Sequence, residues 1–240
     1  VKKENTMNNL RAILFDFDGT IADSEPLHLA AFQEVLVEMC DYRLEEKEYI
    51  KDYLAFDDRN FFLNFSKNHN LGLNESEIVN LMDAKKSHFE TKLGDIIFFE
   101  GILDFIKELS RSFPLAIASG ALESEIKSPL EKVGALSFFE VVVSAEMVTN
   151  GKPDPESFLY ALSLLNEKRT VDKIHPEECL VFEDSIYGVQ AANKSKMRSI
   201  AVTTSLSYDE LSGVSDKVVD TISIESLGSS QVLKKWFLSL

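Results

Sequence analysis

The stretch AILFDFDGT, residues 12–20, places two acidic side chains at the end of an apolar run. The run predicts a buried β-strand from Ala12 to Phe17. Asp16 and Asp18 are two residues apart, and such residues of a strand point to the same face of a sheet. Like charges at this distance repel, and burial makes both carboxylates harder to ionise. These two side chains therefore need a stabilising partner, which makes them the first candidates for a functional site.

The overall composition limits the class of protein. A chain of 240 residues is long enough for one large domain or for a domain with a smaller companion. The formal charge of −15 argues against nucleic acid or an anionic membrane surface as a partner. An anionic substrate would therefore need a local positive feature, such as a metal ion.

The cysteines and the chain ends point to a cytoplasmic setting. Cys40 and Cys179 do not form a C-x-x-C pair, so neither a disulfide framework nor a zinc knuckle is expected. The polar N-terminal stretch lacks the apolar core of a signal peptide. No apolar run reaches the roughly 18 residues that a membrane helix requires. We expect a cytoplasmic monomer with no membrane or nucleic-acid partner.

Short apolar runs alternate with helical patterns along most of the chain, which predicts βαβ units and a parallel sheet. Further strands are expected over 114–120, 140–146, 179–185 and 198–204. Helices are expected over 101–111, 124–134, 155–166 and 185–195. Because the strands are apolar throughout, helices should cover both faces of the sheet. The fold class is therefore α/β, with a Rossmann-like core.

The segment from residue 23 to 99 departs from this alternation, because its pattern is helical throughout. Amphipathic helices are expected over 26–39, 57–68 and 75–93, with Phe61, Phe62 and Phe65 in their core. A structureless connection longer than about 15 residues is uncommon in a compact domain. We therefore expect an inserted helical cap over 23–99, and an α/β core formed by 8–22 and 100–240.

Six polar residues and one glycine follow the predicted strands, at the edge where parallel sheets bind ligands. They are Asp16, Asp18, Ser119, Gly120, Lys152, Glu183 and Asp184. Clustered carboxylates suit Mg²⁺, which also relieves their mutual repulsion. A carboxylate held in such a site can attack a phosphoryl group to form an aspartyl-phosphate. The Lys152 ammonium and the Ser119 hydroxyl are suited to stabilise the charge that develops on the phosphoryl oxygens.

The ordered motifs FDFDGT, ASG, GKPDP and FEDS resemble those of the haloacid dehalogenase superfamily. The insertion resembles the helical cap of the subgroup that contains phosphoglycolate phosphatase and beta-phosphoglucomutase. The resemblance implies that Asp16 is the nucleophile and that Asp18 is the general acid and then the general base. It also implies a set of ligands for the substrate phosphate and for Mg²⁺. The phosphate ligands are Ser119, Gly120 and Lys152, and the metal ligands are Asp16, Asp18 through its backbone carbonyl, Glu183 and Asp184.

Two residues of the insertion are candidate substrate ligands. His28 resembles a cap-side histidine of the mutases, although a lone helical histidine is also commonly structural. Arg59 can bind an anion through two hydrogen bonds, although a solvated helix face explains it equally well. Lys85 and Lys86 are expected to face solvent.

These features predict a Mg²⁺-dependent phosphatase that acts on a small phosphorylated metabolite, with a sugar phosphate favoured, through an aspartyl-phosphate. The resemblance also bears on the type of reaction. Dehalogenases of this superfamily lack an acidic residue at the position of Asp18, so its presence favours phosphoryl transfer over dehalogenation. One alternative is a phosphomutase of the beta-phosphoglucomutase type, whose cap loop carries a lysine ahead of an arginine. The stretch KDYLAFDDR, residues 51–59, does not align such a lysine cleanly. A catalytically silent binding module is the other alternative, and the complete set of motif acids and Lys152 argues against it.

Overall fold

The computed structural model describes residues 9–54 and 56–239, which form two compact units. One unit contains the chain up to Asp23 together with the chain from Ile97 onward, and is called the core unit. The other spans Ser24–Ile96 and is called the helical unit. Each is described separately.

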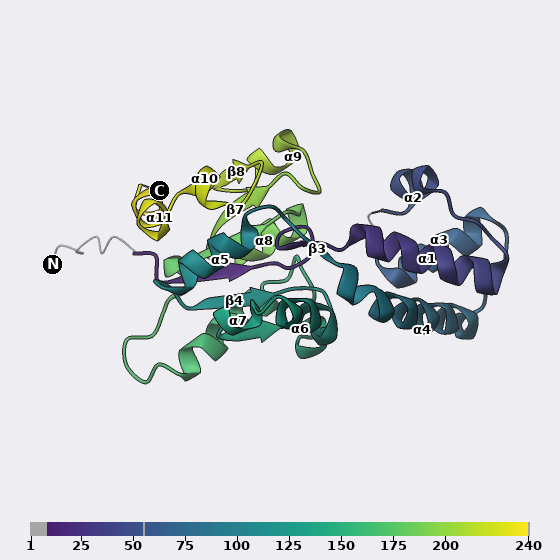
Figure 1. Ribbon diagram of the computed structural model, residues 1–240, viewed down its shortest axis with the longest axis horizontal. Coiled ribbons are helices and arrows are strands. Elements are labelled where there is room, and N and C mark those ends of the chain that lie inside the picture. The colour runs from purple at the N-terminus through teal and green to yellow at the C-terminus, as the bar shows by residue number, and fades with distance from the viewer. Residues whose placement is uncertain (1–8, 55, 240) are drawn as a thin grey trace. The chain divides into compact units, whose positions relative to one another are not determined.

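The core unit is built on a parallel sheet of six strands in the order β5-β4-β1-β6-β7-β8 (Figure 1). The strands are β1 (Ala12–Phe15), β4 (Leu115–Ala118), β5 (Val141–Val143), β6 (Cys179–Glu183), β7 (Arg198–Val202) and β8 (Lys217–Val219). The α/β class and the five predicted strands are confirmed. Each is shorter than predicted at one or both ends, because polar or small residues there belong to loops. β8 was not predicted, since three partly buried residues carry little signal.

Helices cover both faces of this sheet (Figure 1). On one face, Leu14 and Val181 belong to an apolar cluster with Phe158. On the other face, the rings of Phe15 and Phe182 stack 4.9 Å apart, and Phe105 meets Phe182 edge-on at 5.7 Å. The core helices are α5 (Ile102–Ser110), α6 (Glu123–Lys132), α7 (Glu156–Glu167), α8 (Ile186–Lys194), α9 (Tyr208–Ser212), α10 (Ile224–Leu227) and α11 (Ser230–Phe237). The four predicted core helices, α5 to α8, are confirmed.

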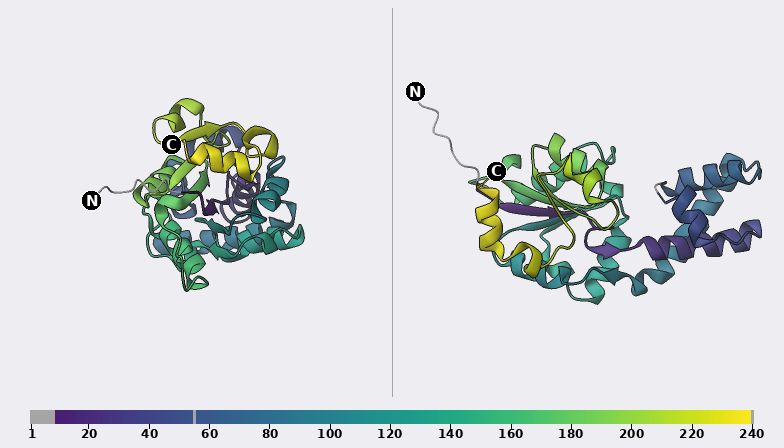
Figure 2. Two further views of the ribbon diagram at one scale, coloured as in Figure 1. Left: turned by 90° about the vertical axis from the view of Figure 1, so that its left-hand side faces the viewer. Right: turned by 90° about the horizontal axis from the view of Figure 1, so that it is seen from above.

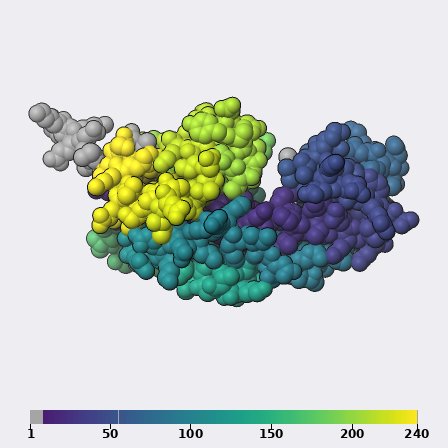
Figure 3. Space-filling model, turned by 45° about the horizontal axis from the view of Figure 1, so that its top comes forward, coloured from purple at the N-terminus to yellow at the C-terminus, as the bar shows by residue number. Residues whose placement is uncertain are grey.

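The C-terminal helices lie on the surface of the core unit beside α5 (Figure 3). Ser230 at the start of α11 donates to Glu108 Oε1 at 3.3 Å, and the Lys234 ammonium lies 4.7 Å from the centre of the Phe113 ring. These contacts anchor the end of the described chain to the α5 segment. Among the described helices, none is long and apolar enough to cross a membrane.

The chain leaves and re-enters the core unit through two very short strands. β2 (Ala22–Asp23) pairs antiparallel with β3 (Ile97–Phe98), with Ala22 opposite Phe98. Four short 3₁₀ turns complete the described elements. They are Leu93–Asp95, Leu136–Phe138, Ala145–Met147 and Pro176–Glu178.

The helical unit contains α1 (Glu25–Cys40), α2 (Glu46–Asp52), α3 (Asp58–Asn68) and α4 (Glu75–Lys92). Figure 2 shows α1 and α4 running side by side. Phe61, Phe62 and Phe65 are buried as predicted, and the Phe61 ring stacks on Phe32 at 3.7 Å. The Asp57 side chain accepts from the Asn60 backbone N–H and thereby caps α3. α2 was not predicted, because Tyr49 is the only buried residue in a polar helix.

Candidate active site

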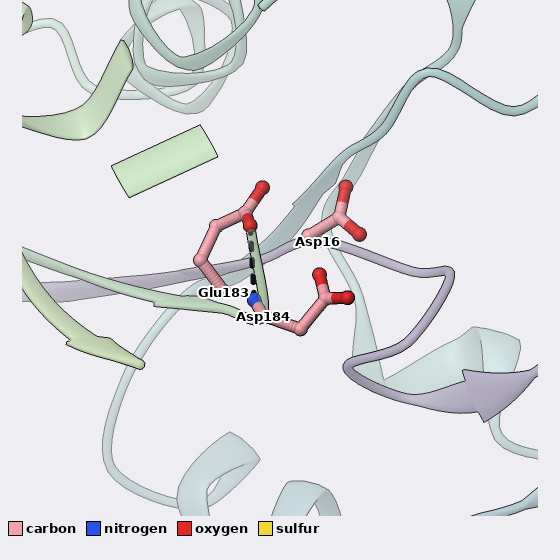
Figure 4. Close-up of side chains that lie close together, drawn as sticks. All are labelled: Asp16, Glu183 and Asp184. Carbon is pink, nitrogen blue, oxygen red and sulfur yellow. Dashed lines mark hydrogen bonds between the residues drawn. The ribbon is translucent and has the colours of Figure 1, made fainter. Parts of the chain in front are cut away.

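Three carboxylates meet at the carboxyl edge of the sheet, where β1 and β6 end. Asp16 directly follows β1, Glu183 is the last residue of β6, and Asp184 follows it. The Asp16 backbone N–H donates to the Phe182 carbonyl at 2.9 Å, which brings the two strand ends together. One carboxylate oxygen from each residue lies within 4.8 Å of the others, and all three residues are buried (Figure 4). These are three of the four acids that the sequence predicted at this edge; Asp18 is not part of this group of three.

Lys152 lies among these acids, in the loop between β5 and α7. Its ammonium donates to Asp16 Oδ1 and to Glu183 Oε1, the latter at 2.7 Å. The ammonium also lies 4.9 Å from the centre of the Phe158 ring. Burial alone lowers the pKa of Lys152, but the Asp16 and Glu183 carboxylates outweigh burial and raise this pKa above its ordinary value. Lys152 is therefore a permanent cation within the cluster.

The cluster still carries an excess of negative charge. Burial raises the pKa of Asp16 to about 7, and the Glu183 and Asp18 carboxylates add to this effect while Lys152 opposes it. Burial also raises the pKa of Asp184, with Glu183 and Asp16 contributing. One ammonium thus fails to compensate the buried carboxylates, and a further cation would stabilise their ionised forms.

Glu183 is held in place by the start of α8. Its Oε2 atom accepts hydrogen bonds from the backbone N–H groups of Asp184 at 2.9 Å and Ser185 at 2.8 Å, and from the Ser185 hydroxyl. A side chain at Gly188 would overlap the Glu183 carboxylate, so this position requires glycine. The Ser185 side chain accepts from the Gly188 N–H and thereby caps α8. Glu183 therefore presents a fixed carboxylate to Lys152.

Asp184 receives two hydroxyl donors from different loops. Thr20 donates to Oδ1 at 3.4 Å, and Ser205 donates to Oδ2. Gly19 has φ of +72°, and a Cβ there would overlap the Asp184 carboxylate. Ser205 was absent from the predicted site. Its only signal was its position one residue beyond the predicted strand 198–204, since no motif marks it.

The remaining core candidates lie at the same edge of the sheet. Ser119 is buried just after β4, and its hydroxyl accepts from the Ala121 N–H at 3.2 Å. β4 neighbours β1 with Ile117 opposite Phe15, so Ser119 and Asp16 follow adjacent strands. Gly120 is exposed and has open space around it. Asp18 is half-buried in the loop after β1 and forms a backbone bridge with Ala22.

His28 lies in the helical unit, against a buried lysine. The prediction that Lys85 faces solvent is wrong, because Lys85 is only 2% exposed. Its ammonium donates to His28 Nδ1 at 2.7 Å, forms an ion pair with Asp58 at 2.9 Å, and lies near two phenylalanine rings. An ammonium can only donate, so His28 carries its ring proton on Nε2. Burial, followed by the Lys85 charge, lowers the pKa of His28 to about 3, which makes the imidazole neutral at pH 7.

Arg59 lies at the start of α3 and is exposed. Its Nη2 atom donates to both carboxylate oxygens of Glu75 at 2.8 Å. Contact of His28 or Arg59 with a substrate stays a prediction. Lys86, the neighbour of Lys85, is exposed as predicted.

The site's donors fit a hard divalent cation. Asp16, Glu183 and Asp184 offer only oxygen ligands, and Mg²⁺ binds through a few carboxylates while it retains water and contacts substrate phosphate. The excess of buried negative charge favours the same ion.

Clustered acids and a lysine at the carboxyl edge of a parallel α/β sheet are suited to phosphoryl transfer, and comparison with known proteins identifies the chain as a hydrolase. Residues 13–202 match the haloacid dehalogenase-like hydrolase family. The chain belongs to this family, as the motifs indicated.

Several relatives are named phosphatases. The chain is 29% identical to the phosphorylated carbohydrates phosphatase of Thermotoga maritima, over 80% of this chain and 84% of that one. It is 28% identical to the fructose-1-phosphate phosphatase YqaB of Escherichia coli, over 79% and 95%. It is also 32% identical to the chloroplastic protein SUPPRESSOR OF QUENCHING 1 of Arabidopsis thaliana, over 82% of this chain but only 18% of that longer protein.

A solved structure shares the fold. The crystal structure of CbbY from Rhodobacter sphaeroides in complex with phosphate has a TM-score of 0.75 and 26% sequence identity to this chain. The match covers 93% of this chain and 99% of CbbY. The similarity therefore extends over nearly the whole of both proteins.

Proposed function

We propose that the protein is a Mg²⁺-dependent phosphatase that hydrolyses a small phosphorylated metabolite, with a sugar phosphate favoured, in the cytoplasm. The observation that carries the proposal is the buried cluster of Asp16, Glu183 and Asp184 with Lys152 donating into it. The substrate class is supported by the relatives named for phosphorylated carbohydrates and for fructose 1-phosphate.

The proposed metal ligands are Asp16, Glu183, Asp184 and the backbone carbonyl of Asp18. Bound Mg²⁺ supplies positive charge that keeps the carboxylates ionised and neutralises the phosphoryl oxygens. Lys152 donates to both Asp16 and Glu183. Its hydrogen bond favours the ionised form of Asp16 and orients this carboxylate, and its ammonium can also bind a phosphoryl oxygen.

In the proposed reaction, an Asp16 carboxylate oxygen attacks phosphorus while the bond from phosphorus to the ester oxygen breaks. Asp18 gives its proton to that oxygen, and the alcohol leaves. Asp18 then removes a proton from water, whose oxygen attacks phosphorus and breaks the bond to Asp16. Ser119, Gly120 and Lys152 are the proposed phosphate ligands during both steps. The products are inorganic phosphate and free Asp16.

We also propose that residues 23–99 act as a cap on the core formed by 8–22 and 100–240, and that they determine which substrate is accepted. His28 would contribute a neutral Nε2–H donor, since Lys85 occupies Nδ1. Arg59 would contribute a guanidinium for a substrate anion.

The test is phosphate release from a panel of sugar phosphates and pyrophosphate, with Mg²⁺ and with EDTA. Asp16→Asn should lower turnover by roughly 10⁴-fold or more, because it removes the nucleophile. Circular dichroism should show an unchanged fold. Full activity of the variant would refute the aspartyl-phosphate. Isomerisation of a sugar 1-phosphate to its 6-phosphate without phosphate release would instead establish a mutase.

A further inference from the structure

The loop after β7 contacts the candidate active site, although no motif marks it. The first residue of the loop is anchored to the end of β8. The Thr203 backbone N–H donates to the Val219 carbonyl at 3.0 Å. The Thr203 hydroxyl donates to Asp220 Oδ1 at 3.1 Å. Ser207, the last residue of the loop, caps the start of α9. The segment between Thr203 and Ser207 is therefore held at both ends.

Two neighbouring hydroxyls of this loop bind to different parts of the site. The Ser205 hydroxyl donates to Asp184 Oδ2, in the segment after β6. The Thr204 hydroxyl donates to the Gly19 carbonyl, in the segment after β1. The loop thus connects the two segments that carry the candidate metal ligands.

Ser205 is the principal side-chain donor to Asp184. The hydrogen bond from Thr20 is 3.4 Å long, which exceeds the usual 2.5–3.0 Å or so between hydroxyl and carboxylate oxygens. Gly19 closes one further side of the carboxylate, since even a Cβ would overlap it. The direction of the Asp184 carboxylate therefore depends mainly on Ser205.

The chemistry of this donor differs from that at Asp16. Lys152 neutralises the carboxylate that it binds, whereas a serine hydroxyl orients a carboxylate and leaves its negative charge intact. A carboxylate oxygen that accepts one hydrogen bond retains a lone pair for a cation. Ligating carboxylates in metal sites are themselves hydrogen-bonded in this way.

We propose that Ser205 is a positioning residue, which fixes the Asp184 carboxylate in the orientation that binds the divalent cation. The cation itself rests on the proposed function. Because Ser205 is exposed and lies in a loop, its hydroxyl can be removed without opening the core. Loss of such a partner typically weakens metal binding by about 10- to 100-fold.

The test measures Mg²⁺ binding to the full chain by titration calorimetry, with no substrate present. Ser205→Ala should raise the Mg²⁺ dissociation constant by about 10-fold, and Ser205→Thr, which keeps a hydroxyl, should restore it to within about twofold. Ser207→Ala is the matched control, because its hydroxyl in the same loop donates to Glu210 Oε2 at 2.6 Å. This control should bind Mg²⁺ as the unaltered protein does. Thermal unfolding in EDTA should show that both variants are folded, with Ser207→Ala the less stable because it loses the cap of α9.

Three results would overturn the inference. One is a Ser205→Ala dissociation constant within twofold of the unaltered protein while Asp184→Asn abolishes binding. Another is an equal loss of affinity in Ser205→Ala and Ser207→Ala, which would indicate a general effect on the loop. The third is no Mg²⁺ binding by the unaltered protein. The variants could change Mg²⁺ binding as expected while the unaltered protein releases phosphate from no substrate. That result would refute the proposed phosphatase activity and leave the role of Ser205 standing.

Discussion

The core unit and the helical unit both bury charged side chains, but they balance that charge differently. In the core unit, Asp16, Glu183 and Asp184 share a single ammonium from Lys152. In the helical unit, the Lys85 ammonium meets the Asp58 carboxylate and a neutral His28 imidazole. One cluster keeps an excess of negative charge, and the other is neutral overall.

This difference distinguishes a cluster with uncompensated charge, the proposed metal site, from a cluster whose charges are balanced within the protein. Burying an uncompensated charge is costly, so the acids of the core unit either hold a proton or would be stabilised in their ionised form by another cation. The Lys85 ammonium needs nothing further, because it also lies 5.0 Å and 4.9 Å from the centres of the Phe32 and Phe89 rings. The comparison therefore supports the proposed Mg²⁺ binding by the core cluster and indicates an internal, orienting role for Lys85.

The strongest test of this contrast removes each buried ammonium in turn. Lys152→Met should lower turnover by about 10²- to 10³-fold, because a group that stabilises developing phosphoryl charge is lost. Its Mg²⁺ affinity should stay the same or increase, since a competing cation has gone. Phosphate-release kinetics and calorimetry measure the two effects. A large loss of Mg²⁺ affinity would show that Lys152 builds the metal site.

Lys85→Met is the matched control for that experiment. It should leave Mg²⁺ binding unchanged and lower the free energy of unfolding by about 2 kcal/mol, because Asp58 loses its partner. Asp58 is partly exposed, which keeps the cost below that of a fully buried pair. Urea denaturation measures the change, and a loss of Mg²⁺ affinity in this variant would contradict the separation of the two clusters.

A second test uses pH in the absence of Mg²⁺. The pKa of Asp16 is raised to about 7 from 3.8, so the folded protein holds this proton more tightly than the unfolded chain. Its stabilising contribution is complete below about pH 4 and is lost as pH rises through about 7, by roughly 4 kcal/mol in total. The stability difference between the unaltered protein and Asp16→Asn should follow this curve in urea denaturation. Added Mg²⁺ should remove the dependence, and a difference that is constant with pH would refute the prediction.

The smallest expected effect concerns His28, whose pH response has the opposite sign. Its pKa is lowered to about 3 from 6.5, so its contribution to stability is present above about pH 6.5 and is lost as pH falls towards 3. Lys85→Met removes the weaker of the two causes and leaves burial, so the pKa of His28 should rise by about one pH unit. NMR titration of the His28 ring, assigned with His28→Asn, measures this pKa. An unchanged value would mean that Lys85 does not influence the ring.

Much of the core unit and its site could be predicted from local patterns. The apolar run before Asp16 and the similar run before Glu183 and Asp184 each predict a buried strand with acids at its end. Parallel strands bring their carboxyl ends to one edge, so the meeting of these acids follows from strand order. The helices around Phe61 and Phe158 were predictable because their apolar residues recur with helical spacing.

The burial of Lys85 and the role of Ser205 depended on tertiary structure. A lysine within a polar helical stretch is expected to be solvated. Phe89 lies one turn away on the same helix, but only the packing of α1 and α3 against α4 brings Phe32 and Asp58 to Lys85. Ser205 meets Asp184 because β7 pairs with β6 in the sheet. Local patterns carry the types and spacing of residues, which determine strands, helices and the acids at their ends. Contacts between distant segments are set by how these elements pack, and those contacts decide which buried charges are balanced within the protein and which require a ligand.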